Sequence, residues 1–197
     1  MADLKNVCKG QTMTRIARAS CVFAGICVVI AAAMAQTKHP VHEPTVFSAE
    51  DEDTSAFRNA LPPSNVVLDA LLKTTEAQQS ADELQKMGRE EQRKLFQVVP
   101  VHLSRPDEVD WIVLGSGPMG GADNEWYWVV RQVGKRAEVL LFANGLALNV
   151  LRSRTNGYKD IETLWAGNLG YEVDRYFHYD GTRYKLVREH TSKLQSQ

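Results

Sequence analysis

Three glycines in the stretch DWIVLGSGPMGG have the spacing of a dinucleotide-binding loop. Gly115, Gly117 and Gly120 match the pattern G-x-G-x-x-G, and the apolar run before them is typical of a strand. A working loop of this kind opens a helix, whose N-terminal amides receive the pyrophosphate. The residues that follow, EWYWVV, alternate as a strand does. We therefore interpret the glycines as bends of a hairpin loop and expect no nucleotide cofactor.

The stretch RTNGYKD places Asn156 and Asp160 close to a glycine, as calcium-binding loops do. An EF-hand loop needs several oxygen ligands at alternating positions. Three basic residues stand around these two: Arg152, Arg154 and Lys159. Their positive charge opposes a divalent cation. We predict that Asn156 and Gly157 form a turn between two strands, that Asp160 begins the next strand, and that no metal is bound.

The sequence also contains candidate residues for serine hydrolysis and for glycoside hydrolysis. Ser116 lies between two glycines, and His102 and His178 are available as bases, but G-S-G differs from the G-x-S-x-G elbow of serine hydrolases. Paired carboxylates for glycoside hydrolysis would come from acidic residues in predicted turns or strand ends: Asp123, Glu125, Asp160, Asp174 and Asp180. A hydrolase acting on cell-wall or other carbohydrate is the alternative function, although the patterns favour a protein that is not an enzyme.

The tryptophans favour binding without catalysis. Trp126 and Trp128 are two residues apart, so they share one face of a predicted strand while Tyr127 and Val129 share the other. An aromatic face beside a glycine-rich loop suits a sugar, peptide or protein partner. We predict a contact surface on loop 115–125 and its neighbours, formed by Trp126, Trp128, Trp165, Asp123 and Glu125. The competing interpretation is that these rings cover a sheet packed by a helix.

The N-terminus predicts export. Basic residues precede the apolar run ASCVFAGICVVIAAA, and Ala33-Met34-Ala35 matches a cleavage site. We expect a signal peptide over 1–35, in which 1–12 are a candidate mis-assigned start, and a periplasmic or secreted location. The apolar run is shorter than the ~20 residues that a membrane-spanning helix needs, so we expect no stable membrane insertion after cleavage.

The remaining chain is free of disulfides, because all three cysteines lie before residue 36. Such an exported domain depends on core packing alone. Without residues 1–35 the chain has 19 basic and 23 acidic residues. This slight negative balance disfavours nucleic acid as a partner and leaves an envelope protein or glycan.

The elements that would position these residues divide the chain at about residue 61. Residues 36–60 contain prolines and the run EDED, which predicts a disordered tether. Ser64 is a suitable N-cap for a helix near 64–75, and a second helical stretch covers 80–94.

From residue 95 onward, short β-rich runs alternate with turns such as Asn144-Gly145 and Asp180-Gly181. The runs are 95–103, 110–115, 125–133, 137–143, 146–152, 160–166, 171–179 and 183–189. Their short connections predict antiparallel neighbours. We expect one α+β domain over 61–190, with one or two N-terminal helices packed on a mainly antiparallel meander sheet of about seven to eight short strands, and a flexible tail over 191–197.

The order GADNEWYWVV, TNGYKDI, YFHYDGTRYKL resembles a group of uncharacterised exported bacterial proteins, frequent in acidobacteria, over roughly residues 95–188. These proteins carry an NGY-x-D-[IL] turn and then a Y-x-[FY]-[DN]-G-x-x-Y hairpin. The resemblance implies export and a β-rich domain, but no activity. NGYKDI is also similar to the hairpin of FG-GAP and VCBS repeats, in which acidic residues ahead of NG bind calcium. This chain has Arg152, Ser153 and Arg154 there, so the metal function is not implied.

Overall fold

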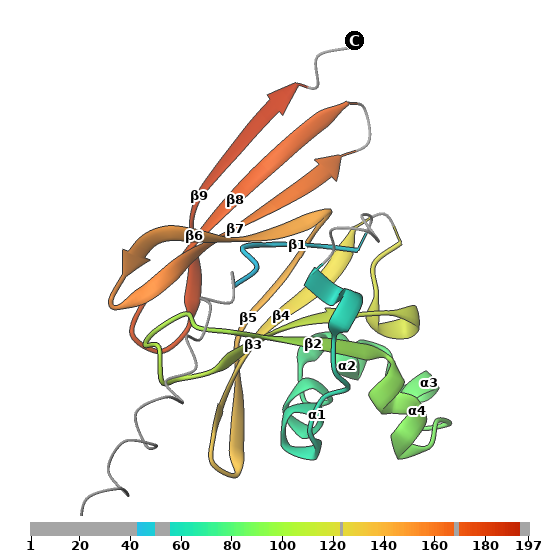
Figure 1. Cartoon of the computed structure of the whole chain (residues 1–197). Helices are drawn as coiled ribbons and strands as arrows, with labels where there is room; N and C mark the ends of the chain where they lie inside the picture. The colour runs from blue at the N-terminus through green and yellow to red at the C-terminus, as the bar shows by residue number, and fades with distance from the viewer. Residues whose placement is uncertain (1–42, 50–55, 123, 168–169, 194–197) are drawn as a thin grey trace, which may run out of the picture. The chain divides into compact units, whose positions relative to one another are not determined.

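The computed structural model describes residues 43–49, 56–122, 124–167 and 170–193 (Figure 1). The chain divides into two compact units, 1–41 and 42–197, and every described residue belongs to the second. The signal peptide expected over 1–35 and the acidic residue Asp123 lie outside the described residues.

Two antiparallel sheets form the body of this unit. The first sheet has the strand order β2-β3-β4-β5, with β2 at Phe96–Val101, β3 at Asp110–Gly115, β4 at Glu125–Val133 and β5 at Arg136–Gly145. The second has the order β1-β6-β7-β8-β9, with β1 at Val46–Ser48, β6 at Ala147–Thr155, β7 at Tyr158–Gly167, β8 at Tyr171–Tyr179 and β9 at Tyr184–Lys193. β5 and β9 are therefore edge strands of different sheets.

The helices are short and pack on one face of the first sheet (Figure 1). They are α1 (Asn65–Leu71), α2 (Thr75–Gln79), α3 (Ala81–Leu84) and α4 (Arg89–Lys94), with the 3-10 turn η2 (Gly117–Met119). The 3-10 turn η1 (Ala56–Asn59) instead contributes Phe57 to the core between the sheets. Ser64 caps α1 as expected, because its hydroxyl accepts a hydrogen bond from the amide of Val67. Thr74 caps α2 in the same way. The helix predicted near 64–75 corresponds to α1, which ends at Leu71, and α2 begins only at the last residue of that range.

The alternation along β4 places two cores on opposite faces of the first sheet. Tyr127 and Val129 face the second sheet, whereas Trp128 and Val130 face the helices, and all four are fully buried. A strand with both faces covered belongs to a middle layer. The described residues thus form a helical layer, a four-stranded sheet and a five-stranded sheet.

The antiparallel β-rich architecture is confirmed, and each of the eight predicted runs overlaps a strand. The strand count and the single meander are wrong, since there are nine described strands in two sheets. β5 and β6 were expected to pair across Asn144-Gly145, but they belong to different sheets. A Cβ at Gly145 would lie 2.5 Å from the carbonyl oxygen of Leu164, so this glycine lets the chain pass close beneath β7.

Two further departures concern the N-terminal part. The helix expected over 80–94 is interrupted between α3 and α4, where Gly88 precedes α4. The tether expected over 36–60 contains β1 and η1, and Phe47 of β1 is fully buried. Three residues are too few to show strand periodicity, so β1 is held by its partner β6 and by its buried ring.

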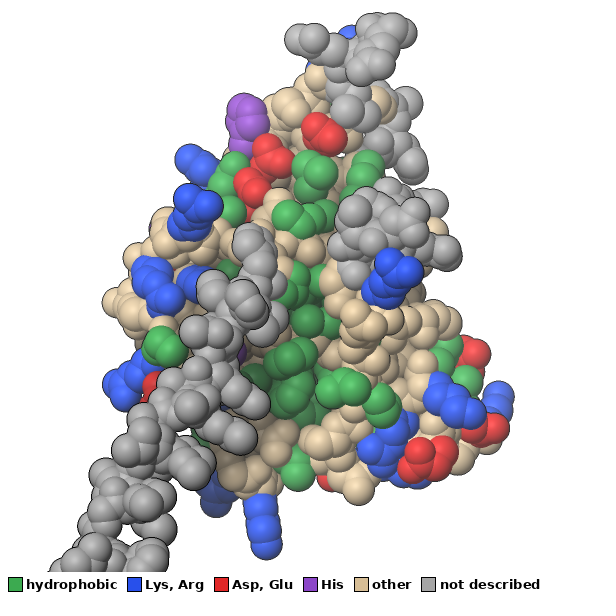
Figure 2. Space-filling model, in the orientation of Figure 1, with side chains coloured by type: hydrophobic (Ala, Val, Ile, Leu, Met, Phe, Trp, Pro, Cys, Tyr) green, Lys and Arg blue, Asp and Glu red, His purple; other side chains and the backbone are tan. Residues whose placement is uncertain are grey.

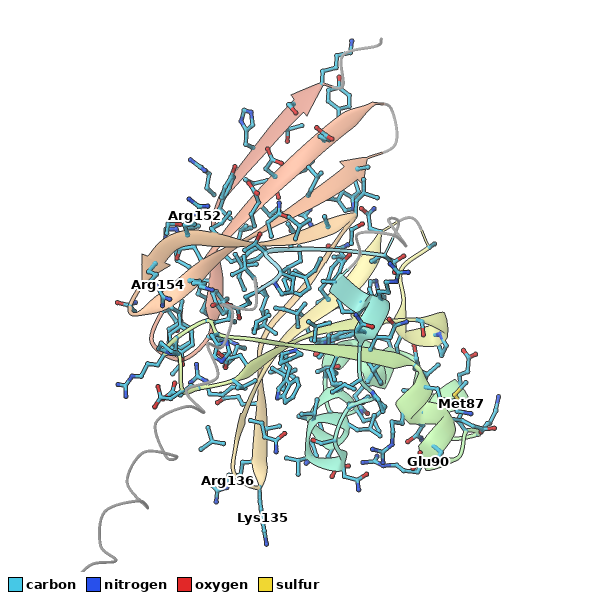
Figure 3. All side chains as sticks on the ribbon, in the orientation of Figure 1. Met87, Glu90, Lys135, Arg136, Arg152 and Arg154 are labelled. Atoms are coloured by element: carbon cyan, nitrogen blue, oxygen red, sulfur yellow. The ribbon has the colours of Figure 1, made fainter. Side chains whose placement is uncertain are left out.

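The distribution of charged and hydrophobic side chains on the surface differs between the layers. Figure 2 shows acidic and basic side chains close together over the helices, whereas hydrophobic side chains gather along the middle of the same face. Figure 3 places Lys135 and Arg136 at the tip of the β4–β5 hairpin and Arg152 and Arg154 on β6. Among the described helices, none has the length and apolar character to cross a membrane.

Candidate functional site

The predicted aromatic residues do not share one surface. Trp128 is fully buried against Phe96, with ring centroids 5.7 Å apart, so its ring serves the helix-side core. Trp126 is half-buried and packs edge to face on Phe142 at 5.6 Å. Trp165 lies in the other sheet, where the guanidinium of Arg175 stands 5.8 Å from its ring. Glu125, at the start of β4, is half-buried.

The glycine-rich loop is a bend, as its sequence predicts. The strand β4 follows it, with only the short turn η2 between. A Cβ at Gly115 would lie 1.9 Å from the carbonyl oxygen of Met119, and a Cβ at Gly121 would lie 1.6 Å from that of Asn124. These glycines allow the backbone to fold closely onto itself.

The NGY stretch is a two-residue β-turn. Thr155 pairs with Tyr158, while Asn156 and Gly157 have φ angles of 50° and 84°. The side-chain amide of Asn156 donates a hydrogen bond to the carbonyl oxygen of Tyr179 at 2.8 Å, and this bond connects the turn to β8. Arg154 donates to the carbonyl oxygen of Gly157 at 2.9 Å, so a cation already occupies this side of the turn. Within the described residues, no group of three His, Cys, Asp or Glu side chains is arranged to hold a metal ion.

The candidate carboxylates have separate structural roles. Asp160 is buried on β7, 3.8 Å from the Nε2 atom of His178. Asp180 accepts hydrogen bonds from the amides of Arg183 and Thr182 and from the Thr182 hydroxyl, and these bonds hold the pKa of its carboxyl well below the usual range. This acid therefore fixes the turn that begins β9.

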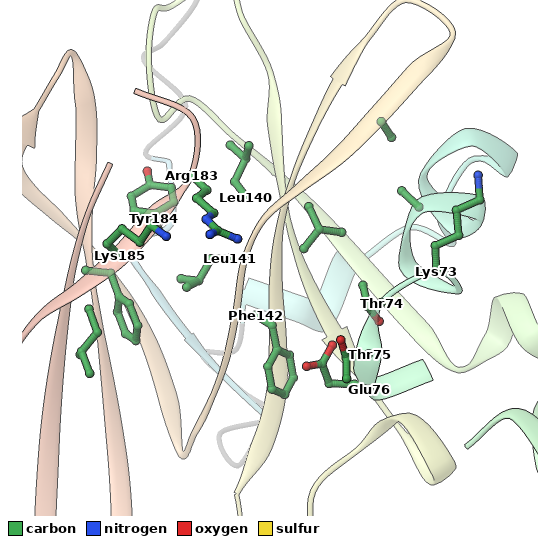
Figure 4. A pocket seen from close by; sticks show the side chains of 15 residues that line it. Lys73, Thr74, Thr75, Glu76, Leu140, Leu141, Phe142, Arg183, Tyr184 and Lys185 are labelled. Carbon is green, nitrogen blue, oxygen red and sulfur yellow. The ribbon is translucent and has the colours of Figure 1, made fainter. Parts of the chain in front are cut away.

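A groove lies between the free edges of β5 and β9, and we call it the β5–β9 groove. Its main hollow has a volume of about 790 Å³ and is closed at one side by the connection from α1 to α2. In Figure 4, Leu140, Leu141 and Phe142 of β5 stand between Arg183, Tyr184 and Lys185 on one side and Lys73, Thr74, Thr75 and Glu76 on the other. Its volume lies in the range of small-molecule binding sites.

The groove continues along β5 into a second hollow of about 290 Å³. Phe142, Phe177 and Leu186 line both hollows and so connect them. At the far end Arg175 donates to Asn144 at 3.1 Å and to Glu189 at 2.9 Å. Because β5 lines the groove from residue 137 to residue 144, the groove is about 23 Å long at ~3.3 Å per residue.

A bulge in β5 gives the groove its apolar wall. Val129 pairs with Leu141 and Val130 with Val139, so Leu140 is an extra residue on β5. Leu140 and Leu141 consequently both belong to the core between the sheets, while Phe142 belongs to the core under the helices. The sequence signal was the run VLLFA, in which strict alternation fails, but this run does not reveal which distant strand lies opposite.

A second cluster of polar side chains occupies one end of the space between the sheets. Asp110 is buried, and its Oδ1 atom lies 3.5 Å from the Nε atom of Arg131. The Arg131 guanidinium stands 4.6 Å from the ring of Tyr158 and 5.4 Å from that of Tyr179. Burial raises the pKa of Asp110 to about 6, although Arg131 acts to lower it. The buried Oδ2 atom of Asp110 and the Nε and Nη2 atoms of Arg131 have no hydrogen-bond partner among the described residues, but they belong to this one loose ion pair. We therefore interpret the cluster as structural.

Comparison of the chain with protein-family models, with curated proteins and with solved structures finds no match.

Proposed function

We propose that this protein is a non-catalytic binding protein whose ligand lies in the β5–β9 groove. The observation that carries the proposal is a groove with an apolar wall between two sheet edges, in which Leu186 remains 52% exposed. Full burial of a leucine is worth about 1.5–3 kcal/mol, so covering the exposed half of Leu186 is worth about 1 kcal/mol. A ligand that fills the groove would gain this free energy without any rearrangement of the core.

Binding suits the groove better than catalysis does. Its two acids, Glu76 and Glu189, line different hollows, and Glu189 is paired with Arg175. Carboxylates that hydrolyse glycosides face each other across about 5–9.5 Å, with the bond to be cleaved between them. The apolar lining between these two acids offers no such pair, so the groove does not support the alternative of a carbohydrate hydrolase.

The predicted tryptophan surface contributes indirectly to this proposal. Phe142 lines the groove on one side and contacts Trp126 and Trp128 on the other, with ring centroids 5.6 and 5.3 Å apart. The tryptophans would thus support the wall of the site and report on its occupancy by their fluorescence.

The test uses N-phenyl-1-naphthylamine, an uncharged dye that fluoresces in apolar surroundings, with the chain from Gln36 onward. We expect the dye to bind, and Leu186→Lys to abolish binding because a charge would enter the groove. The matched control is Val187→Lys. Val187 is 51% exposed, as Leu186 is, but does not line the groove.

Two results would contradict the proposal. One is an absence of dye fluorescence with the unaltered protein, and the other is an equal loss in both variants. Circular dichroism of each variant verifies that the sheets are intact.

We also propose a periplasmic or secreted location, supported by the apolar run and cleavage motif in residues 1–35. Mass spectrometry of the protein recovered from each cell fraction tests it. An N-terminus at Gln36 in the exported fraction is expected, whereas retention of the intact chain in the cytoplasm would contradict it.

A further inference from the structure

We infer that the β5–β9 groove binds a single-chain anionic amphiphile, a long-chain carboxylate, with the chain along β5 and the carboxylate beside Arg183 and Lys185. The inference depends on the proposed binding function and goes further by naming the class of ligand.

The apolar part of the groove matches one hydrocarbon chain. Aliphatic and aromatic side chains line it along most of its length: Val139, Leu140, Leu141, Phe142, Phe177 and Leu186. A membrane hydrocarbon core of ~30 Å holds two opposed chains, so one chain is about 15 Å long. A groove of about 23 Å therefore accommodates one such chain together with its head group.

The charge at the main hollow is complementary to an anion. Lys73, Arg183 and Lys185 line this hollow with a single acid, Glu76. None of the three cations forms a salt bridge with another described residue. Arg183 immediately precedes β9 and Lys185 lies near its start, so these two cations stand together on one side of β5, while Lys73 follows α1 on the other side (Figure 4).

The backbone that carries Arg183 and Lys185 is held in place by its neighbours. Tyr184 is buried between these two residues, and its hydroxyl donates to the carbonyl oxygen of Lys159 at 2.8 Å. Arg183 is fixed by the Asp180 turn, since its amide donates to that carboxylate at 2.9 Å. Arg183 and Lys185, which flank Tyr184 in sequence, both line the main hollow. The backbone at this end of the groove is thus organised before a ligand arrives.

Addition of a peptide strand to either edge fits the structure less well. The extra residue Leu140 interrupts β5, and Val187 interrupts β9 in the same way, since Phe177 pairs with Leu186 and Tyr176 with Arg188. Bulges and charged side chains on an edge oppose the continuous ladder that an added strand needs. A flexible hydrocarbon chain needs no backbone partners and follows such an irregular wall.

The experiment measures displacement of N-phenyl-1-naphthylamine by hexadecanoate from the chain that begins at Gln36. We expect hexadecanoate to displace the dye, and hexadecyltrimethylammonium, with the same chain and a positive head, to bind at least about tenfold more weakly. We expect the double variant Arg183→Glu/Lys185→Glu to lose affinity for hexadecanoate about tenfold and to keep its affinity for the neutral dye.

The control is Arg105→Glu/Arg152→Glu, which changes the net charge equally with two exposed residues that do not line the groove. It should bind hexadecanoate as the unaltered protein does. Equal losses in the two double variants would overturn the inference, because net charge alone would then explain the effect. Equal affinity for the cationic amphiphile would overturn it as well.

Two further probes separate other occupants. Vesicles of dipalmitoyl phosphatidylglycerol test a two-chain lipid, and an acidic-apolar peptide of alternating Glu and Val tests strand addition. Displacement of the dye by either probe but not by hexadecanoate would overturn the inference and leave the binding function standing. If the dye itself does not bind, the proposed function fails first, so the two failures are distinguishable.

Discussion

One side of the interface between the two sheets is covered, and the other side is open. On one side β1 and η1 cover the core with the rings of Phe47 and Phe57, whose centroids are 5.9 Å apart. On the other side the edges of β5 and β9 face a groove, where Leu186 is half-exposed. Among the described residues, no segment covers that second side. A short additional segment thus closes one side of the interface, and the side without such a segment among the described residues is an open groove.

The closed side also has an ionic clasp, defined here as Glu43 with His102 and Lys159. The carboxylate of Glu43 accepts hydrogen bonds from the His102 amide and from the ammonium of Lys159, the latter at 3.0 Å. Burial acts to raise the pKa of Glu43, but these donors outweigh it and hold the pKa below its ordinary value. The segment that leads into β1 is thus attached by charge as well as by its buried ring.

The sharpest test of this comparison is a matched pair of truncations. Phe47→Ala should reduce the free energy of unfolding by about 3–5 kcal/mol, because it leaves a cavity under the closed side. Leu186→Ala on the open side should reduce it by less than about 1 kcal/mol, since half of that side chain already contacts water. Urea denaturation of both variants provides the measurement. Comparable losses would show that the open side is as much a part of the core as the closed side.

The buried pair at the end of the interface should give a pH dependence of stability. The pKa of Asp110 is raised to about 6 in the folded protein, above the value of 3.8 for an exposed aspartate. The protonated carboxyl of Asp110 therefore contributes fully to the free energy of unfolding below the unfolded pKa. This contribution is lost as the pH rises through about 6. Between about pH 7.5 and about pH 5 the free energy of unfolding should increase by about 1 kcal/mol from this group.

Asp110→Asn is the control for this titration. Urea denaturation of both proteins across that range should show a smaller increase on acidification in the variant than in the unaltered protein. Identical pH dependence would mean that the carboxyl of Asp110 is ionised in the folded state throughout, and that Arg131 compensates fully for its burial.

The smallest expected effect concerns the clasp. Glu43→Gln keeps the shape and removes the charge, so it should destabilise the domain by about 0.5 kcal/mol near neutral pH. Because the pKa of Glu43 is lowered on folding, this contribution should vanish as the pH falls below its ordinary value of 4.5. Addition of salt should reduce it as well. A loss that ignores both pH and salt would show that packing, and not charge, attaches this segment.

Local patterns were sufficient for much of the fold. Period-two alternation located the eight longer strands, and Asn156-Gly157 was identified as a turn because two residues of positive φ suit a tight hairpin. Ser64 was identified as a cap from its residue type and its place just before apolar residues at helical spacing. The glycines of loop 115–121 were correctly interpreted as bends, since a strand pattern follows them.

The short-range pattern carried no information about how the strands divide between sheets. Gly145 has the chemistry of a hairpin turn, yet it marks the passage from one sheet to the other, because its missing side chain admits the backbone of β7. The aromatic alternation of Trp126 and Trp128 was clear, but which face would be covered depended on where the helices packed. Alternation along a strand shows which residues share each of its two faces, but it does not show which element packs against each face.

Residue types and spacings along this chain were enough to place its strands, its turns and the first helix cap, because those features arise from interactions between residues near in sequence. The groove could not be placed in that way. Its walls come from β5, β9 and the connection after α1, and they meet only because β5 and β9 end different sheets. Contacts between segments so far apart follow from packing of the whole domain, which leaves no mark at a fixed spacing in the sequence.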